Sequence, residues 1–217
     1  MSCVLCNRRK EKRFCLAVHG RICPQCCGEQ REVTLDCPSE CPYLQQARQH
    51  ERRRPEDVLS DEMFPEIDVS TQFMRDREPL AFGILHTIAN AARADRNLTD
   101  RDLSGGLTNM TKAYQTLVGS GLVYQEALPN LVQQSLVDEI ETLLKEFREV
   151  EQQHLGYSRL KDSDVLKTLV WILRLVPLHS SGRPRSRGFL DFVREMFHDA
   201  QPPGAAGGEA SSRIILP

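Results

Sequence analysis

The chain has 217 residues, of which 40% are hydrophobic and 27% charged, and its net charge is −2. These values are typical of a globular protein of one or two domains. The chain is neither strongly basic nor strongly acidic, so its net charge does not indicate a class of partner. The longest apolar stretch, residues 166–176, is too short and too amphipathic to span a bilayer, so no membrane association is expected.

The cysteines are confined to the first 41 residues. This segment has few large apolar side chains and cannot bury a core of its own. The start of the chain has no apolar signal segment, so we expect a cytoplasmic protein, in which disulfides are rare and metal-binding thiolates are common. The eight cysteines are Cys3, Cys6, Cys15, Cys23, Cys26, Cys27, Cys37 and Cys41.

The spacing of these cysteines favours zinc. Two residues separate Cys3 from Cys6, and two separate Cys23 from Cys26. Two intervening residues allow a tight turn that directs both sulfurs at one tetrahedral zinc ion, at metal–sulfur distances of about 2.3 Å. Repeated pairs of this kind in one short segment predict a structural metal module.

Eight thiolates predict two zinc ions, and we expect an interleaved arrangement. Adjacent side chains point in different directions, so Cys26 and Cys27 are assigned to different ions. His19 follows Cys15 by four residues and could replace Cys27, although the neighbouring Gly20 favours an exposed turn. The first predicted site is Cys3, Cys6, Cys23 and Cys26, and the second is Cys15, Cys27, Cys37 and Cys41.

Two other uses of clustered cysteines are a redox switch and a catalytic zinc site. A redox-sensitive zinc switch needs an accessible thiolate, which a closed four-sulfur site suppresses, so it ranks below a structural role. Nucleobase deaminases need a glutamate in His-x-Glu and a proline before Cys-x2-Cys, but Arg21 and Ile22 occupy those places. The deaminase reaction is therefore excluded.

The sequence from residue 22 to 32 is ICPQCCGEQRE, and residues 37–44 are CPSECPYL. These motifs resemble the N-terminal segment of a group of uncharacterised bacterial cysteine-rich proteins, of the kind found in Acidobacteria-type genomes. The resemblance covers roughly residues 1–45. It implies a bacterial zinc-binding protein and brings no established activity with it.

Residues 1–54 carry 11 basic and 6 acidic residues, a net charge of +5. Two zinc ions with eight thiolates would reduce this to about +1. Some of the arginines are expected to donate to thiolate sulfurs, and only Phe14 and Tyr43 are available for base stacking. The candidates for contact with nucleic acid or a protein partner are Arg8, Arg9, Lys10, Lys12, Arg13, Arg52, Arg53 and Arg54.

The predicted fold class is mainly α, with a small double-zinc module at residues 1–54. A helix over residues 43–54 is expected to end the module before a proline. A linker with few packing residues is expected over 55–78, and an all-α bundle domain over 79–199. The last segment, 200–217, has the composition of a disordered tail.

Within the bundle domain, apolar residues recur at helical spacing. Thr99 and Asp102 resemble a capping box that opens the second helix, and Gly105 and Gly106 could allow another helix to approach it closely. The same spacing can form a coiled-coil seam, so homo-oligomerisation stays open. The expected helices cover residues 79–94, 99–118, 130–154, 162–176 and 188–197.

No catalytic site is expected in the bundle. Two Glu-x2-His pairs, at 151–154 and 195–198, match the ligand pair of di-iron bundles. The stretches 80–94 and 103–118 contain no carboxylate to complete such a site. The arginine-bearing loop over residues 180–188 is expected to be solvated.

Residues 55–217 carry 17 basic and 24 acidic residues, a net charge of −7, so the two parts of the chain are oppositely charged and could contact each other. The sequence therefore favours a non-catalytic zinc protein that binds a protein partner in an interaction or regulatory role. The alternative is a nucleic-acid-binding regulator that uses the basic residues of the module.

Overall fold

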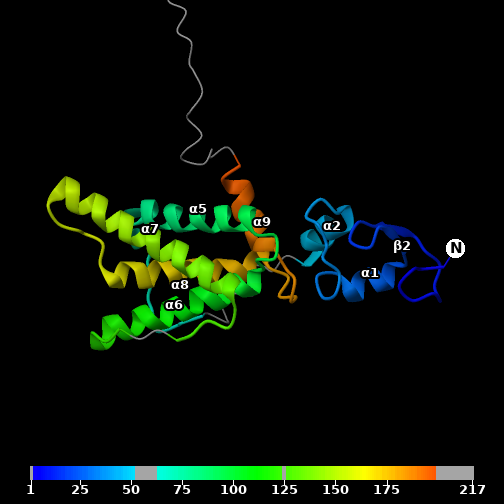
Figure 1. Ribbon diagram of the computed structural model, residues 1–217, viewed down its shortest axis with the longest axis horizontal. Helices are drawn as coiled ribbons and strands as arrows, with labels where there is room; N and C mark the ends of the chain where they lie inside the picture. The colour runs from blue at the N-terminus through cyan, green and yellow to red at the C-terminus, as the bar shows by residue number, and fades with distance from the viewer. Residues whose placement is uncertain (1, 52–62, 124–125, 199–217) are drawn as a thin grey trace, which may run out of the picture.

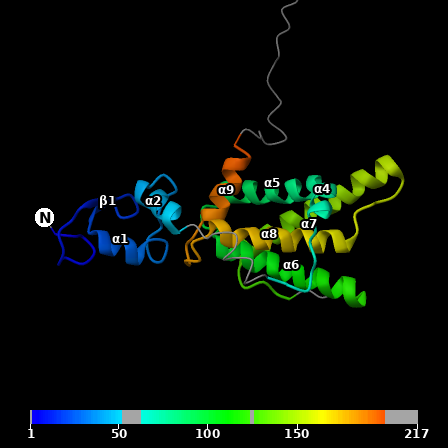
Figure 2. The same cartoon turned by 180° about the vertical axis from the view of Figure 1, so that it is seen from behind.

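The computed structural model describes residues 2–51, 63–123 and 126–198. The protein is elongated, with a small cysteine-rich module at one end and a helical bundle at the other (Figure 1), and the view from behind shows the same division (Figure 2). The fold is mainly α, as the sequence predicts. The expected tail, 200–217, lies outside the described residues.

The module contains a β-hairpin and two helices. Strands β1 (Arg13–Cys15) and β2 (Gly20–Ile22) pair antiparallel. Helix α1 (Pro24–Gln30) follows directly, and helix α2 (Pro42–Glu51) matches the described part of the predicted helix over 43–54. The sequence pattern predicts neither the hairpin nor α1, because both are too short to show a hydrophobic period.

The bundle is built around a central helix. Helix α8 packs against α5, α6 and α9, and Figure 1 shows it running between α5 and α6. Its residues Val165, Leu166, Leu169, Val170, Ile172, Leu173 and Val176 are buried, which confirms the predicted core, while Trp171 and Leu175 are partly buried. None of the helices in the described parts of the chain combines the length and the apolar character needed to cross a membrane. The bundle helices are α5 (Glu78–Ala94), α6 (Asp100–Ser120), α7 (Leu131–Leu155), α8 (Asp162–His179) and α9 (Gly188–Met196).

A capping box sets the start of α6, and a pair of glycines allows α6 to pack closely against α7. The hydroxyl of Thr99 accepts from the Asp102 N–H, and the Asp102 carboxylate accepts from the Thr99 N–H, so the predicted capping box is confirmed. A Cβ added at Gly106 would lie 3.3 Å from the Val137 side chain. The glycine pair therefore lets α7 approach α6 closely, as the sequence predicts.

The described part of the expected linker packs on the bundle. It contains helix α4 (Thr71–Asp76), and the side chain of Ile67 is buried in the bundle core. The guanidinium of Arg174 donates to the carbonyl oxygens of Met63, Phe64 and Ile67. A planar guanidinium with several N–H groups can satisfy such a set of carbonyls. Residues 63–77 therefore belong to the bundle, a difference from the expected linker.

A buried carboxylate joins α6 to α9. Asp100, the first residue of α6, is 1% exposed and accepts from the Ser186 hydroxyl at 2.7 Å. It also accepts from the backbone N–H groups of Phe189 and Leu190, at 3.3 and 3.1 Å. Arg187, the N-cap residue of α9, makes no side-chain cap hydrogen bond. Asp100 thus satisfies the free N–H groups of α9 from another helix.

Substitution of Asp100 by Ala is expected to lower the free energy of unfolding by about 3 kcal/mol, because it leaves several buried donors without an acceptor. Urea denaturation followed by circular dichroism measures the loss. Asp76→Ala is the control, since Asp76 is exposed and accepts only from Gln72 of its own helix among the contacts seen; it should change stability by less than about 0.5 kcal/mol. Equal losses in the two variants would contradict the capping role.

Candidate metal centre

The first cysteine pair lies on a tight turn near the N-terminus. The Cys3 N–H donates to the Arg9 carbonyl, and the Asn7 N–H donates to the Cys3 carbonyl. Asn7 has a φ of +51°, in the left-handed region that Asn adopts more readily than most residues. The turn directs the N–H groups of Arg8 and Arg9 at the Cys6 sulfur.

The second pair spans the junction of β2 and α1. Cys23 is the N-cap residue of α1, and its sulfur accepts from the Cys26 N–H at 3.4 Å. Pro24 occupies the first turn of α1, where its missing N–H costs nothing. A backbone hydrogen bond of 3.1 Å from Val4 to the Arg21 carbonyl holds the first turn against β2. This contact brings the two pairs together.

The sulfurs of Cys3, Cys6, Cys23 and Cys26 all lie within 4.8 Å of one another. Three of the four residues are buried, and Cys6 is half-buried. A tetrahedral zinc ion with bonds of about 2.3 Å would place its sulfurs about 3.8 Å apart, so the cluster fits such an ion after a small contraction. The structure therefore brings together the four residues that the sequence assigns to the first site.

The thiols of this cluster differ in acidity. Burial raises the pKa of Cys3, but the backbone N–H groups of Cys23, Cys6 and Leu5 outweigh it and lower the pKa to about 6. The hydrogen bond of Cys26 to the Cys23 sulfur, together with burial, raises the Cys26 pKa to about 12. Four sulfurs this close cannot all ionise without a cation among them, and a thiophilic metal ion is a group that would supply that charge.

Arg9 provides a further donor to the cluster. Its pKa is raised, chiefly by a hydrogen bond from its guanidinium to the Cys23 sulfur and also by the nearby charges of Cys6 and Cys26, despite the opposing effect of burial. Arg9 is therefore the arginine of the module that best fits the expected role of a donor to a thiolate.

The other four cysteines are Cys15, Cys27, Cys37 and Cys41. Cys15, Cys27 and Cys41 are buried, and Cys37 is half-buried. Burial raises the pKa of Cys37 to about 11, and the negative charges of Cys15 and Cys41 contribute to the shift. Cys15 and Cys41 thus lie near Cys37, but among the described residues no group of three or more ligands from these four cysteines comes within 4.8 Å of one another. The second metal site stays a prediction.

His19 is not part of the cluster formed by Cys3, Cys6, Cys23 and Cys26. It lies in the turn between β1 and β2, where it is exposed and has a φ of +48°. The interpretation of His19 as an exposed turn residue is confirmed.

The predicted basic contact residues differ in their surroundings. Arg8, Arg9, Lys10 and Lys12 are exposed. The guanidinium of Arg13 lies over the Tyr43 ring, 4.6 Å from its centroid, so this pair is engaged within the module. Arg52, Arg53 and Arg54 lie outside the described residues.

The loop over 180–188 is solvated only in part: Gly182, Pro184 and Arg185 are exposed, as expected, but other residues of the loop are buried or contact the module. Ser186 is fully buried, and the Arg183 guanidinium donates to the carbonyl oxygens of Gly28 and Arg31, at 2.9 and 2.8 Å. These carbonyls lie at the C-terminal end of α1, where the last turn of a helix lacks partners. The loop therefore docks the bundle on the module.

The sequence gives no role to Glu32 or Asp191, and it offers Arg48 only as one of the basic residues of the nucleic-acid alternative. The Arg48 guanidinium pairs with Glu32 at 2.9 Å and with Asp191 at 2.7 Å, and Glu32 is only 1% exposed. Opposite net charges predict that the two parts of the chain meet, and this is confirmed. Net charge does not indicate which side chains meet, because each residue of this group resembles an ordinary surface charge in the sequence.

Substitution of Arg9 by Ala is expected to weaken metal binding about tenfold, because hydrogen bonds to ligating atoms typically change metal affinity by about ten- to a hundredfold. Competition with a chromophoric chelator measures the affinity. Arg8→Ala is the matched control, since the contact from Arg8 to Cys6 uses its backbone N–H, which the substitution retains. Equal affinities for the two variants would refute the role of the Arg9 guanidinium.

The structure thus shows one cluster of four cysteine sulfurs, a second group beside it, and a polar contact with the bundle. Comparison with known protein families, curated proteins and solved structures finds no match for this chain.

Proposed function

We propose that this chain is a non-catalytic zinc-binding protein that acts through contacts with other proteins, in an interaction or regulatory role. Zinc is the favoured ion because both donor groups consist of thiolates, which bind soft or borderline metals, and because two residues separate the cysteines of each knuckle pair. One ion would bind the cluster of Cys3, Cys6, Cys23 and Cys26. The second would bind Cys15, Cys27, Cys37 and Cys41.

The proposed zinc ions have a structural role. Four thiolates complete a tetrahedral zinc ion and leave no position for a water molecule or a substrate. The N–H groups and the Arg9 guanidinium that contact the sulfurs of the first cluster favour bound thiolates over free, reactive ones. The same protection weighs against the redox switch. Binding of the ions would supply folding free energy that the small apolar core of the module lacks.

The observation that carries the protein-binding role is the contact within this chain. The module already holds a polypeptide loop, since Arg183 donates to carbonyl groups of α1 and the Ser181 hydroxyl donates to Glu32 at 2.8 Å. Polar contacts of this kind are typical of transient protein interfaces. The nucleic-acid alternative is weaker, because Arg9 and Arg13 are engaged within the module.

Elemental analysis of the purified chain is expected to give two zinc ions per chain. Cys6→Ser should remove the first ion and Cys37→Ser the second, so each variant should retain one, because the two ions share no ligand. A wild-type content well below two ions, or the loss of both ions in either variant, would contradict the two-site model.

Affinity capture with the tagged chain distinguishes the two candidate partners. A protein-binding role predicts that captured partners remain after nuclease digestion and after replacement of Lys10 and Lys12 by Ala, because protein contacts need neither nucleic acid nor those cations. Quantitative mass spectrometry measures the recovery, with Lys112→Ala as the control for an exposed lysine of the bundle. Loss of the partners in both the digested and the Lys10/Lys12 samples would favour the nucleic-acid-binding regulator.

A further inference from the structure

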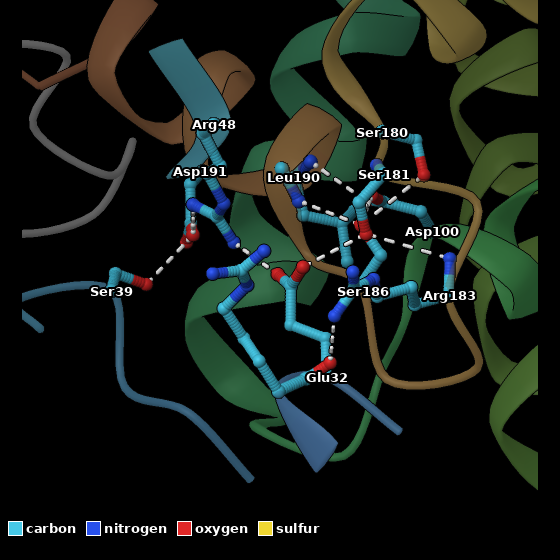
Figure 3. A network of polar contacts seen from close by, with 12 residues as sticks. Glu32, Ser39, Arg48, Asp100, Ser180, Ser181, Arg183, Ser186, Leu190 and Asp191 are labelled. Atoms are coloured by element: carbon cyan, nitrogen blue, oxygen red, sulfur yellow. Dashed lines mark hydrogen bonds and ion pairs between the residues drawn. The ribbon is translucent and has the colours of Figure 1, made fainter. Parts of the chain in front are cut away.

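The contact between the module and the bundle is polar. Figure 3 shows the network, in which Arg48, Ser39 and Glu32 of the module meet Ser181 and Asp191 of the bundle. The apolar cores on either side share no residue among the described parts of the chain. Contacts without a shared apolar core allow two units to separate more readily than a continuous core would.

Glu32 connects the cysteines to the bundle through each of its polar groups. Its N–H lies close enough to the Cys37 sulfur to lower the pKa of that thiol, against the larger opposing effect of burial. Its carbonyl accepts from the Arg185 N–H at 2.9 Å. Its carboxylate accepts from Arg48 at 2.9 Å and from the Ser181 hydroxyl at 2.8 Å. One residue thus contacts the second group of cysteines and the docking loop simultaneously.

The backbone of Glu32 is held in an unfavourable conformation. Its φ is +54°, in the left-handed region, which costs a residue with a side chain about 1 kcal/mol. Such a conformation persists only when surrounding contacts enforce it. The contacts that do so are the approach of its N–H to Cys37 on one side and the bonds from the bundle on the other.

The other module groups at the contact also lie beside cysteines of the second group. Gly28, whose carbonyl accepts from Arg183, directly follows Cys27. Ser39 stands between Cys37 and Cys41, and its hydroxyl donates to Asp191 at 2.7 Å. The positions of these groups therefore depend on how the second group of cysteines is held.

Separation of the two parts would leave each of the three carboxylates of the contact with a cation. Glu51, which lies 3.5 Å from the Arg183 guanidinium, keeps Arg31 of the same module. Glu32 keeps Arg48, which belongs to the same module. Asp191 keeps Arg194, which lies 3.4 Å away on the same helix. An unpaired buried charge is the main obstacle to opening a polar contact, and this arrangement avoids it.

We propose that zinc bound by Cys15, Cys27, Cys37 and Cys41 controls the docking of the module on the bundle, and that Glu32 is the residue that couples the two. With the ion bound, the cysteines fix the chain around Glu32, and its carbonyl and carboxylate face the loop over 180–188. Loss of the ion frees this segment to leave the left-handed conformation, so that Arg185 and Ser181 lose their acceptors. The inference rests on the proposed two-zinc function and adds a regulatory role to the second ion.

Hydrogen exchange of the Arg185 amide in the full chain tests the proposal, because this N–H donates to Glu32 only when the module is docked. Cys37→Ser, with one zinc ion left, should speed the exchange about tenfold or more, the range of a typical coupling between sites. Cys6→Ser, which loses the other ion, should leave the rate within about twofold of wild type. Amides of 169–173 in α8 should stay protected in both variants, which separates undocking from unfolding of the bundle.

A second pair of variants tests Glu32 itself. Glu32→Gln should retain two zinc ions, since its N–H to Cys37 is intact, but should speed the Arg185 exchange and enlarge the radius of gyration in X-ray scattering. Glu29→Gln is the matched control, because Glu29 is exposed on α1 and should change neither quantity.

The zinc count separates failure of this inference from failure of the proposed function. Unchanged Arg185 exchange in Cys37→Ser, in a sample whose zinc content has fallen from two ions to one, overturns the regulatory role and leaves the structural zinc sites in place. A wild-type chain without a second ion overturns both.

Discussion

The convergence of four sulfurs from two tight turns is the contact on which the module depends. Few of its large aliphatic side chains are buried, namely Ile22, Leu35 and Leu44 among the described residues. A segment of this size does not fold on so small an apolar core alone. The hairpin and α1 are correspondingly short, and they serve to place cysteines rather than to bury surface. The cysteine cluster thus takes the part that an apolar core takes in the bundle.

The bundle follows the opposite principle, since its helices bury continuous apolar stripes around α8. Polar groups are used there mainly to complete helix ends and to hold connecting segments. Asp100 caps α9, and Arg174 holds the segment before α4, in each case from a distant part of the chain. Arg183 of the bundle likewise donates to a carbonyl at the C-terminal end of α1, in the module. The module and the bundle are therefore joined in the same way that helix ends are completed within the bundle, by a side chain from a distant part of the chain that pairs with free backbone groups.

The sequence predicts the features whose causes are local. Thr99 and Asn130 cap their helices, and the two-residue spacing of Cys3 and Cys6 identifies a knuckle. It does not predict the acceptors of Arg183, because those are main-chain carbonyls about 150 positions away and every residue has a carbonyl. The conformation of Glu32 also has no sequence signal, since a positive φ is normally associated with Gly or Asn. The second group of cysteines includes single residues without a paired turn, so spacing alone does not settle its geometry.

The order in which a ribosome makes the chain gives the contact at Glu32 another consequence. The Ser181 hydroxyl that reaches Glu32 is added 149 residues later, and Asp191 follows Arg48 by 143 residues. At a translation rate of about 5 to 20 residues per second, the module has about 7 to 30 seconds to fold and acquire metal before its docking surface exists. A nascent module that has not captured its ion within that interval would meet the bundle with Glu32 unfixed. Metal supply during synthesis, and not only in the finished protein, would then decide how much of the chain is made in the docked form.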